Sequence, residues 1–148
     1  MKCIFLKRII QNVFGYFNLL FKGIHHNKGV YVGKGVRFSN RNIFFGKYSL
    51  IRPHCSFFVL SFICGSNCDI GEQNRFRGKV LIGNDVLIGP DNFFASNSHN
   101  YSNPKIPIIK QGASNGIDDK NIIIINDGSW IGTHCAILGN VTIGHNSV

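Results

Sequence analysis

Apolar residues recur at every sixth position along two stretches of the chain. A period of six fits neither the 3.6-residue turn of an α-helix nor the simple alternation of a two-sided strand. A hexapeptide repeat is typical of a parallel β-helix, whereas the short strands of a β-sandwich vary in length and spacing. The pattern therefore favours an all-β solenoid over a sandwich. The repeating positions are Cys64, Ile70, Phe76, Ile82, Ile88 and Phe94, and then Ile125, Ile131, Ile137 and Ile143.

Two further regularities accompany the period of six. Glycine follows many of the apolar positions, as in Ile82-Gly83 and Ile88-Gly89, and it suits a backbone that turns sharply. We expect each hexapeptide to form a strand and a corner, three to close a triangular coil, and coils to stack about 4.8 Å apart. The apolar residue and the residue four positions later should both point inward. That second position is small or β-branched at Cys68, Val80, Val86, Ser98, Ser129, Cys135, Val141 and Ser147, with asparagine at 74 and 92.

Residues 1–28 differ from the rest of the chain. Between residues 3 and 24, apolar residues recur at helical spacing with basic and polar residues between them, which predicts a short amphipathic helix. Lys7 and Arg8 interrupt the apolar run, which argues against a membrane-spanning helix and a signal peptide. Two roles remain open for this segment: a cap on the end of the solenoid, and a peripheral contact with an anionic membrane. Its apolar positions are Leu6, Ile9, Ile10, Val13, Phe17, Leu20, Phe21 and Ile24.

The solenoid should then span residues 29–148, with one long interruption. Residues 99–121 lack the period of six and contain two prolines, two glycines and many polar residues. Long loops in compact domains are usually functional. The period resumes at Ile122 and continues to Val148 without a capping segment, so we expect the chain to be incomplete at its C-terminal end.

Composition narrows the range of partners. The 148 residues form one domain with a net charge of +9, which suits anionic ligands or membranes, but no nucleic-acid-binding motif accompanies the charge. Four of the five cysteines fall on inward positions of the repeat, so we interpret them as small buried apolar residues and not as disulfides or metal ligands. Free cysteines predict a reducing compartment, the cytoplasm. The amphipathic segment adds the inner face of the membrane as an expected location.

His99 begins the long interruption. A histidine between a rigid coil and a loop is well placed for proton transfer, because its ordinary pKa lies near neutral pH. The alternative is a polar loop histidine with no role. Around it, the segments Val80 to Asn92, Ser98-His99-Asn100-Tyr101 and Asp127 to Gly144 resemble the hexapeptide-repeat acyltransferases, especially the galactoside, xenobiotic and capsular-polysaccharide O-acetyltransferase group.

This resemblance implies a left-handed β-helix and an active homotrimer, with acetyl-CoA bound between adjacent prisms. It implies that His99 is the catalytic base, that Trp130 and Thr133 contact acetyl-CoA, and that Asn74, Arg75 and Tyr101 lie on the acceptor side. The activity implied is direct transfer of an acetyl group to a hydroxyl of a sugar or a cell-surface polysaccharide precursor, without a metal.

Two other functions stay open beside this one. The first is an inactive, truncated β-helix that acts as a scaffold. The second is a γ-class carbonic anhydrase, which needs three histidines that converge on zinc. The carbonic anhydrase is disfavoured because Pro104 stands five residues after His99, and because the spacing of His134 and His145 does not place them on one face of the solenoid.

Overall fold

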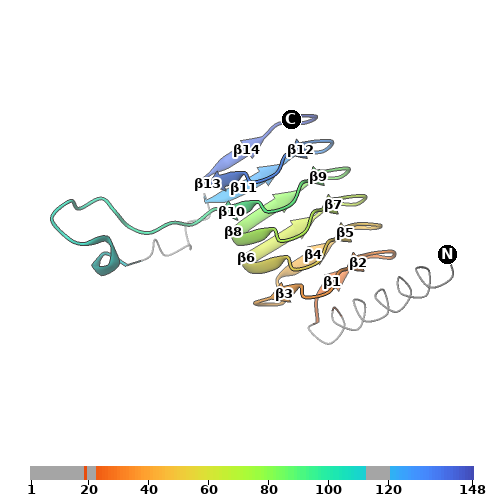
Figure 1. Ribbon diagram of the computed structural model, residues 1–148, viewed down its shortest axis with the longest axis horizontal. Helices are drawn as coiled ribbons and strands as arrows, with labels where there is room; N and C mark the ends of the chain where they lie inside the picture. The colour runs from red at the N-terminus through yellow and green to blue at the C-terminus, as the bar shows by residue number, and fades with distance from the viewer. Residues whose placement is uncertain (1–18, 20–22, 113–120) are drawn as a thin grey trace.

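The chain forms a left-handed parallel β-helix of about six turns (Figure 1). The computed structural model describes residue 19 and residues 23–112 and 121–148. The predicted all-β solenoid and its left hand are confirmed, although parallel crossovers are almost always right-handed in other folds. The predicted N-terminal helix lies almost entirely outside the described residues.

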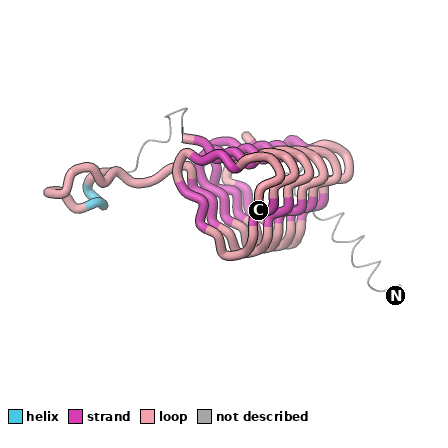
Figure 2. Tube along the Cα trace, turned by 90° about the horizontal axis from the view of Figure 1, so that it is seen from above, coloured by secondary structure: helices cyan, strands magenta, loops and turns pink. Residues whose placement is uncertain are grey.

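Seen along its axis, the prism has three flat faces (Figure 2). We call them the first, second and third face, in the order in which the chain crosses them from residue 31 onward. The first face holds β2 (Tyr31–Val32), β5 (Leu50–Ile51), β7 (Asp69–Ile70), β9 (Leu87–Ile88) and β12 (Trp130–Ile131).

The second and third faces share two long strands that bend around the corner between them. These strands are β6 (Ser56–Cys64) and β8 (Arg75–Ile82). Their first halves lie on the second face with β3 (Arg37–Phe38), β10 (Phe93–Ala95) and β13 (Ala136–Leu138). Their second halves lie on the third face with β1 (His25–His26), β4 (Ile43–Phe45), β11 (Ile122–Ile125) and β14 (Val141–Ile143).

The register explains why the period of six shifts frame before residue 64. Ile70 pairs with Ile88, which is three hexapeptides later, but Ile51 pairs with Ile70, a step that is longer by one residue. The register between β6 and β8 changes between Val59 and Ser61, so Leu60 is an extra residue at this corner. The extra residue bulges outward and leaves the inward positions on either side aligned.

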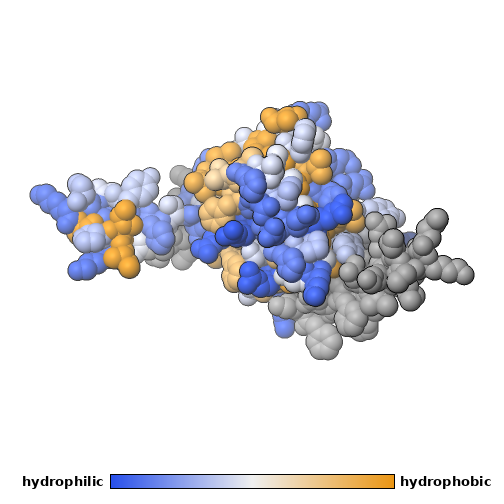
Figure 3. Space-filling model, in the orientation of Figure 1, coloured by the Kyte–Doolittle hydropathy of each residue, from blue (hydrophilic) through white to orange (hydrophobic). Residues whose placement is uncertain are grey.

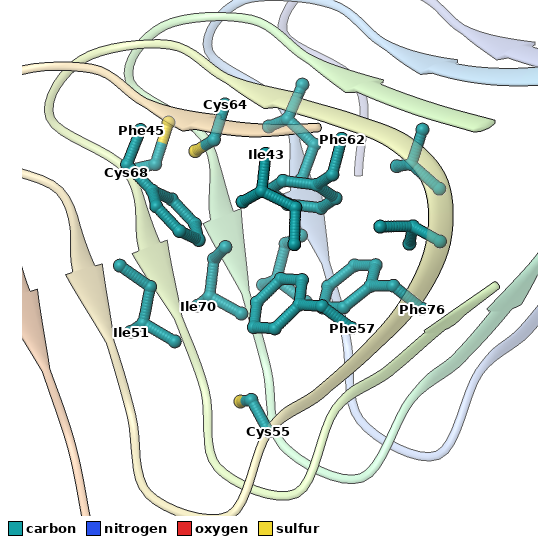
Figure 4. Close-up of a cluster of buried hydrophobic side chains, with 14 of the residues drawn as sticks. Ile43, Phe45, Ile51, Cys55, Phe57, Phe62, Cys64, Cys68, Ile70 and Phe76 are labelled. Carbon is teal, nitrogen blue, oxygen red and sulfur yellow. The ribbon is translucent and has the colours of Figure 1, made fainter. Parts of the chain in front are cut away.

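The repeating apolar positions form the core of the prism (Figure 4). Phenylalanines stack on one another along the axis: the rings of Phe57 and Phe76 are 5.0 Å apart, and those of Phe76 and Phe94 are 4.7 Å apart, both nearly parallel. Each coil presents the same inward position to the next, so identical rings come face to face in offset stacks. Ile137 and Ile143, on the last coil, are only partly buried because no further described coil covers them.

The glycines after the apolar positions are required by close packing between coils. A Cβ atom on Gly71 would lie 2.6 Å from the carbonyl carbon of Gly89, and one on Gly89 would lie 2.5 Å from the carbonyl oxygen of Gly132. Neither Gly71 nor Gly89 has a positive φ. The left-handed backbone occurs elsewhere in the corner, one residue before the small inward position, as at Asn67 and Asp91. This refines the sequence interpretation, in which glycine serves the turn itself.

Three cysteines behave as the sequence predicts. Cys55, Cys64 and Cys68 are free and buried, and Cys135 is partly buried in the last coil. Burial raises the pKa of the Cys55 thiol to about 12, and its Sγ donates to the carbonyl oxygen of Gly71 at 3.0 Å. A hydrogen bond with Cys68, together with burial, also raises the pKa of Cys64. Buried thiols of this kind are packing residues and poor nucleophiles.

One long excursion interrupts the stack. Leu87 pairs with Trp130 and Phe93 pairs with Ala136, so paired residues are here 43 positions apart. A regular coil of three hexapeptides would separate them by 18 positions, and the additional residues therefore lie outside the coil. The prediction that Ser98 points inward is wrong, because β10 ends at Ala95 and Ser98 is exposed. Ile123 takes the inward place above Val80 instead. The consecutive β-branched residues at 122–125 fill that strand better than the polar segment at 97–100.

Candidate active site

The excursion contains a compact segment, residues 100–112, that we call the arm. Its ends are joined by the backbone N–H of Asn100, which donates to the carbonyl oxygen of Gly112 at 3.1 Å. Inside it, the side-chain amide of Gln111 donates to the carbonyl oxygens of Asn103 at 2.8 Å and Ile106 at 2.6 Å. The arm includes a short 3₁₀ helix, η1 (Ile108–Lys110). It therefore holds its own shape while it projects away from the prism (Figures 1 and 2).

The arm presents apolar side chains to solvent. Tyr101 is 73% exposed and Ile109 is 89% exposed, and Ile106 and Ile108 are also exposed. In Figure 3 the hydrophobic colour on this projecting segment is separate from that on the prism. Exposed large apolar groups gathered on one element mark an interaction site more often than an ordinary surface.

His99 lies at the base of the arm and is exposed. It follows the end of β10 by four residues, at the corner between the second and third faces. A rigid coil precedes His99 and the hydrogen-bonded arm follows it, so its backbone is held at this corner. Geometry of this kind suits a general base that must meet a bound substrate.

Trp130 and Thr133 occupy a different part of the prism. Trp130 is on β12 of the first face, where it pairs with Leu87, and its side chain is 49% exposed. Thr133 is exposed at the corner after β12, and its hydroxyl donates to the carbonyl oxygen of Pro90 at 3.0 Å. The arm leaves from the corner opposite the first face. A single prism therefore does not bring His99 together with Trp130 and Thr133.

Asn74 is placed differently from the other predicted acceptor residues. Its side chain is fully buried, and its amide group donates to the carbonyl oxygens of Gly71 and Gly89, both at 2.8 Å, and accepts from the N–H of Asn92 at 2.9 Å. A side chain with no exposed surface and a full set of backbone partners does not contact a bound sugar. The repeat itself carries this signal, because Asn74 stands four residues after Ile70, at an inward position.

Arg75 and Tyr101 are both exposed, on β8 and the arm respectively. Arg77 was not predicted as a site residue, but it points out of the same strand as Arg75 because alternate residues of a strand share a face. Neither arginine forms an ion pair with a described carboxylate; the described pair joins Arg52 and Asp69 at 2.6 Å. The alternation Arg75-Phe76-Arg77 in the sequence already indicates that both arginines lie on the outer side of the strand.

The described residues contain no cluster suited to a metal ion. Within residues 23–112 and 121–148, no three His, Cys, Asp or Glu side chains come together as a metal site. In the same part of the chain, no helix has the length and apolar character that crossing a bilayer requires.

Comparison with known proteins gives structural matches. No protein-family model matches the sequence, and no curated protein does. A mutant of AntD, an N-acyltransferase from Bacillus cereus in complex with dTDP-4-amino-4,6-dideoxyglucose and coenzyme A, superposes with a TM-score of 0.73 and 20% identity, over 88% of this chain and 72% of that one. The chain has the fold of a hexapeptide-repeat acyltransferase.

A second AntD structure, in complex with dTDP and 3-hydroxybutyryl-CoA, matches over the same shares with a TM-score of 0.70 and 19% identity. The TM-scores of these two matches establish a shared fold, while the sequence identity stays near 20%.

Proposed function

We propose that the protein is an acyl-CoA-dependent acyltransferase that modifies a sugar. The observation that carries the proposal is the single long excursion in the described solenoid, which begins at His99 and forms a self-supporting arm. The excursion adds no strand to the stack, and long excursions from a compact fold are usually functional. The structures of AntD, which hold coenzyme A together with a dTDP-sugar, or dTDP with an acyl-CoA, on the same fold, support this assignment.

His99 is the proposed general base. Its imidazole takes the proton of the acceptor hydroxyl or amine as the oxygen or nitrogen attacks the thioester carbonyl. The new bond to the acyl carbon forms while the C–S bond breaks, and His99 returns the proton to the leaving thiolate. No acyl-enzyme is needed, because holding both substrates in one orientation supplies much of the rate.

We infer that the active form is a homotrimer. The arm leaves one corner of the prism and Trp130 lies on the opposite face, so a neighbouring prism has to supply one half of the site. The third face supports side-by-side packing, because its outward residues in successive coils are Phe44, Ile63, Leu81 and Ile124. The exposed isoleucines of the arm would be covered by the same neighbour. Light scattering at several protein concentrations tests the assembly.

The finer chemistry is also a proposal. The sequence resemblance favours acetyl as the group transferred and a hydroxyl as the acceptor. The AntD structure with a 4-amino sugar favours an amine instead. Incubation with acetyl-CoA and matched pairs of hydroxyl and amino sugars, followed by mass spectrometry, separates the two: a product from only one member of each pair identifies the acceptor atom.

The location follows from the substrates. We propose that the reaction takes place in the cytoplasm, where acyl-CoA is available and thiols stay reduced. Residues 3–24 add a peripheral membrane contact to this proposal. Flotation of the protein with anionic liposomes, with and without residues 1–24, tests it, and equal binding by both forms would refute the contact.

The deciding experiment is the substitution His99→Ala, with His25→Ala as the matched control. We expect His99→Ala to lower turnover at least ~100-fold, the usual contribution of a general base. His25, exposed on β1 at the other end of the stack, should be replaceable without loss. Turnover near that of the unmodified protein in His99→Ala would refute the proposed base. Failure to bind any acyl-CoA would favour the scaffold instead.

A further inference from the structure

The second face carries an exposed pair of arginines between two aromatic rings. Arg75 and Arg77 project from the first half of β8. In the coil before them, Phe58 lies beside Arg77, and it is 52% exposed. In the coil after them, Phe93 lies beside Arg75 and is partly exposed. We call Phe58, Arg75, Arg77 and Phe93 the arginine patch.

The geometry of the patch follows from the strand register. Arg75 and Arg77 are two residues apart on one face of a strand, which separates their Cα atoms by about 6.6 Å. Phe58 and Phe93 sit one coil below and one coil above, each about 4.8 Å away. The four side chains therefore form a flat array of two cations with an aromatic ring at opposite corners.

The charge of the patch is not neutralised by the described part of the fold. Among the described residues, the ion pair is between Arg52 and Asp69 on the first face. Glu72 and Asp91, at the corner that precedes the second face, form no ion pair with either arginine. Two guanidinium groups without a carboxylate partner attract an anion. The planar guanidinium group can donate two parallel hydrogen bonds to a phosphate.

We infer that the arginine patch binds the nucleoside diphosphate part of the acceptor, with one phosphate on each arginine and the base on Phe58 or Phe93. Aromatic side chains stack on nucleobases of any identity. This inference rests on the proposed function, because it identifies the acceptor as a nucleotide-linked sugar and names the residues that hold it.

The patch lies close to His99. Arg77 pairs with Ala95, and the N–H of Ser96 donates to the carbonyl oxygen of Arg77 at 3.2 Å. His99 follows Ala95 by four residues, so its Cα is at most about 14 Å from that of Ala95. A ligand anchored by its diphosphate on the patch therefore extends its sugar toward the base of the arm.

The test measures binding without turnover. Thymidine diphosphate is titrated into the full chain by calorimetry, in the absence of acyl-CoA. We expect the double variant Arg75→Ala/Arg77→Ala to bind it at least ~10-fold more weakly, because hydrogen bonds to charged groups are lost. Arg75→Lys/Arg77→Lys should keep part of the affinity. Arg37→Ala, an exposed arginine of the same column on β3, is the matched control and should bind as the unmodified protein does.

Two comparisons define the ligand. One of the two variants Phe58→Ala and Phe93→Ala should weaken the binding of thymidine diphosphate but not that of inorganic pyrophosphate. If neither variant separates the two ligands, the role of the rings is overturned. Coenzyme A should bind the double arginine variant normally. If coenzyme A alone loses affinity, the patch holds its phosphates and the inference is wrong.

Two results bear on the inference as a whole. Unchanged affinity of the folded double variant for thymidine diphosphate would overturn it. Binding of thymidine diphosphate through the patch, without acyl transfer to any sugar, would leave the patch standing and refute the proposed function.

Discussion

The coil stack and the arm are built on opposite principles. In the stack, each coil is held by its neighbours, through ring stacks such as Phe76 on Phe94 and glycine contacts such as Gly71 on Gly89. The arm is held by itself, through the hydrogen bonds of Gln111 and Asn100, and it leaves its isoleucines exposed. The stability of a solenoid comes from the contacts between neighbouring coils. A segment that makes no such contacts can therefore vary for function without loss of stability. Five predictions test this division.

The largest expected effect is the loss of activity when the arm is removed. Replacement of residues 100–112 by a short Gly-Ser linker keeps His99 but deletes the exposed apolar residues. We expect turnover to fall at least ~100-fold, because substrates are no longer positioned. The far-UV circular dichroism of the stack should be preserved. Unfolding of the shortened chain would contradict the division between stack and arm.

Truncation of a stacked ring should have the opposite effect. Phe76→Ala removes a fully buried side chain between Phe57 and Phe94. We expect the free energy of unfolding, measured by urea titration, to fall by about 3–5 kcal/mol. Ile109→Ala in the arm is the control and should change stability by less than about 0.5 kcal/mol. Similar losses in both variants would show that the arm packs against the prism.

The glycines offer a matched pair within one column of the stack. In Gly89→Ala the new methyl group meets the backbone of the following coil, and we expect a loss of about 1–3 kcal/mol from overpacking. Gly132→Ala has no described atom within 4 Å of the added methyl group and should be nearly neutral. Thermal unfolding of the two variants measures the difference. A tolerated Gly89→Ala would mean that the coils separate more easily than the stacking implies.

Stability should fall in alkaline solution. The folded-state pKa of Cys55 is raised to about 12, above the ordinary value of 9.0. Above pH 9 the unfolded chain loses the thiol proton while the folded chain keeps it, so the unfolding free energy falls by about 1.4 kcal/mol per pH unit toward pH 12. Cys55→Ala should show a shallower decline over this window. Equal slopes for both proteins would indicate that the Cys55 thiol ionises in the fold.

The smallest expected effect concerns thiol reactivity. Cys55, Cys64 and Cys68 are buried and Cys135 is partly exposed. In a Cys3→Ser background, a maleimide should label Cys135 first, and the three buried thiols should react only after unfolding. Mass spectrometry of tryptic peptides identifies the labelled residue. Early labelling of Cys64 would show that the stack opens locally on the time scale of the reaction.

Much of the stack can be predicted from the sequence, but the arrangement of the site cannot. The inward places of Ile70 and Ile88 follow from a period of six, because each coil repeats the environment of the last. The same period predicts an inward position for Ser98, but Ser98 is exposed. The segment around it continues the spacing by chance, and its polar residues do not pack in the core. The family resemblance assigns Asn74 to the acceptor although its inward position is visible in the repeat. The alternation Arg75-Phe76-Arg77 places Arg77 on the outer side of its strand together with Arg75, but its neighbours Phe58 and Phe93 are known only from the register of the adjacent coils.

The sequence by itself determined the solenoid, most of its inward positions and the presence of one long excursion. These features depend on the spacing of apolar residues along the chain, which can be read directly from the sequence. Only the tertiary structure decided that glycines serve contacts between coils, that the four residues of the arginine patch form one array, and that His99 and Trp130 lie on opposite sides of a prism. Those facts depend on which residues of different coils come into register. The extra residue at Leu60 and the length of the excursion set that register.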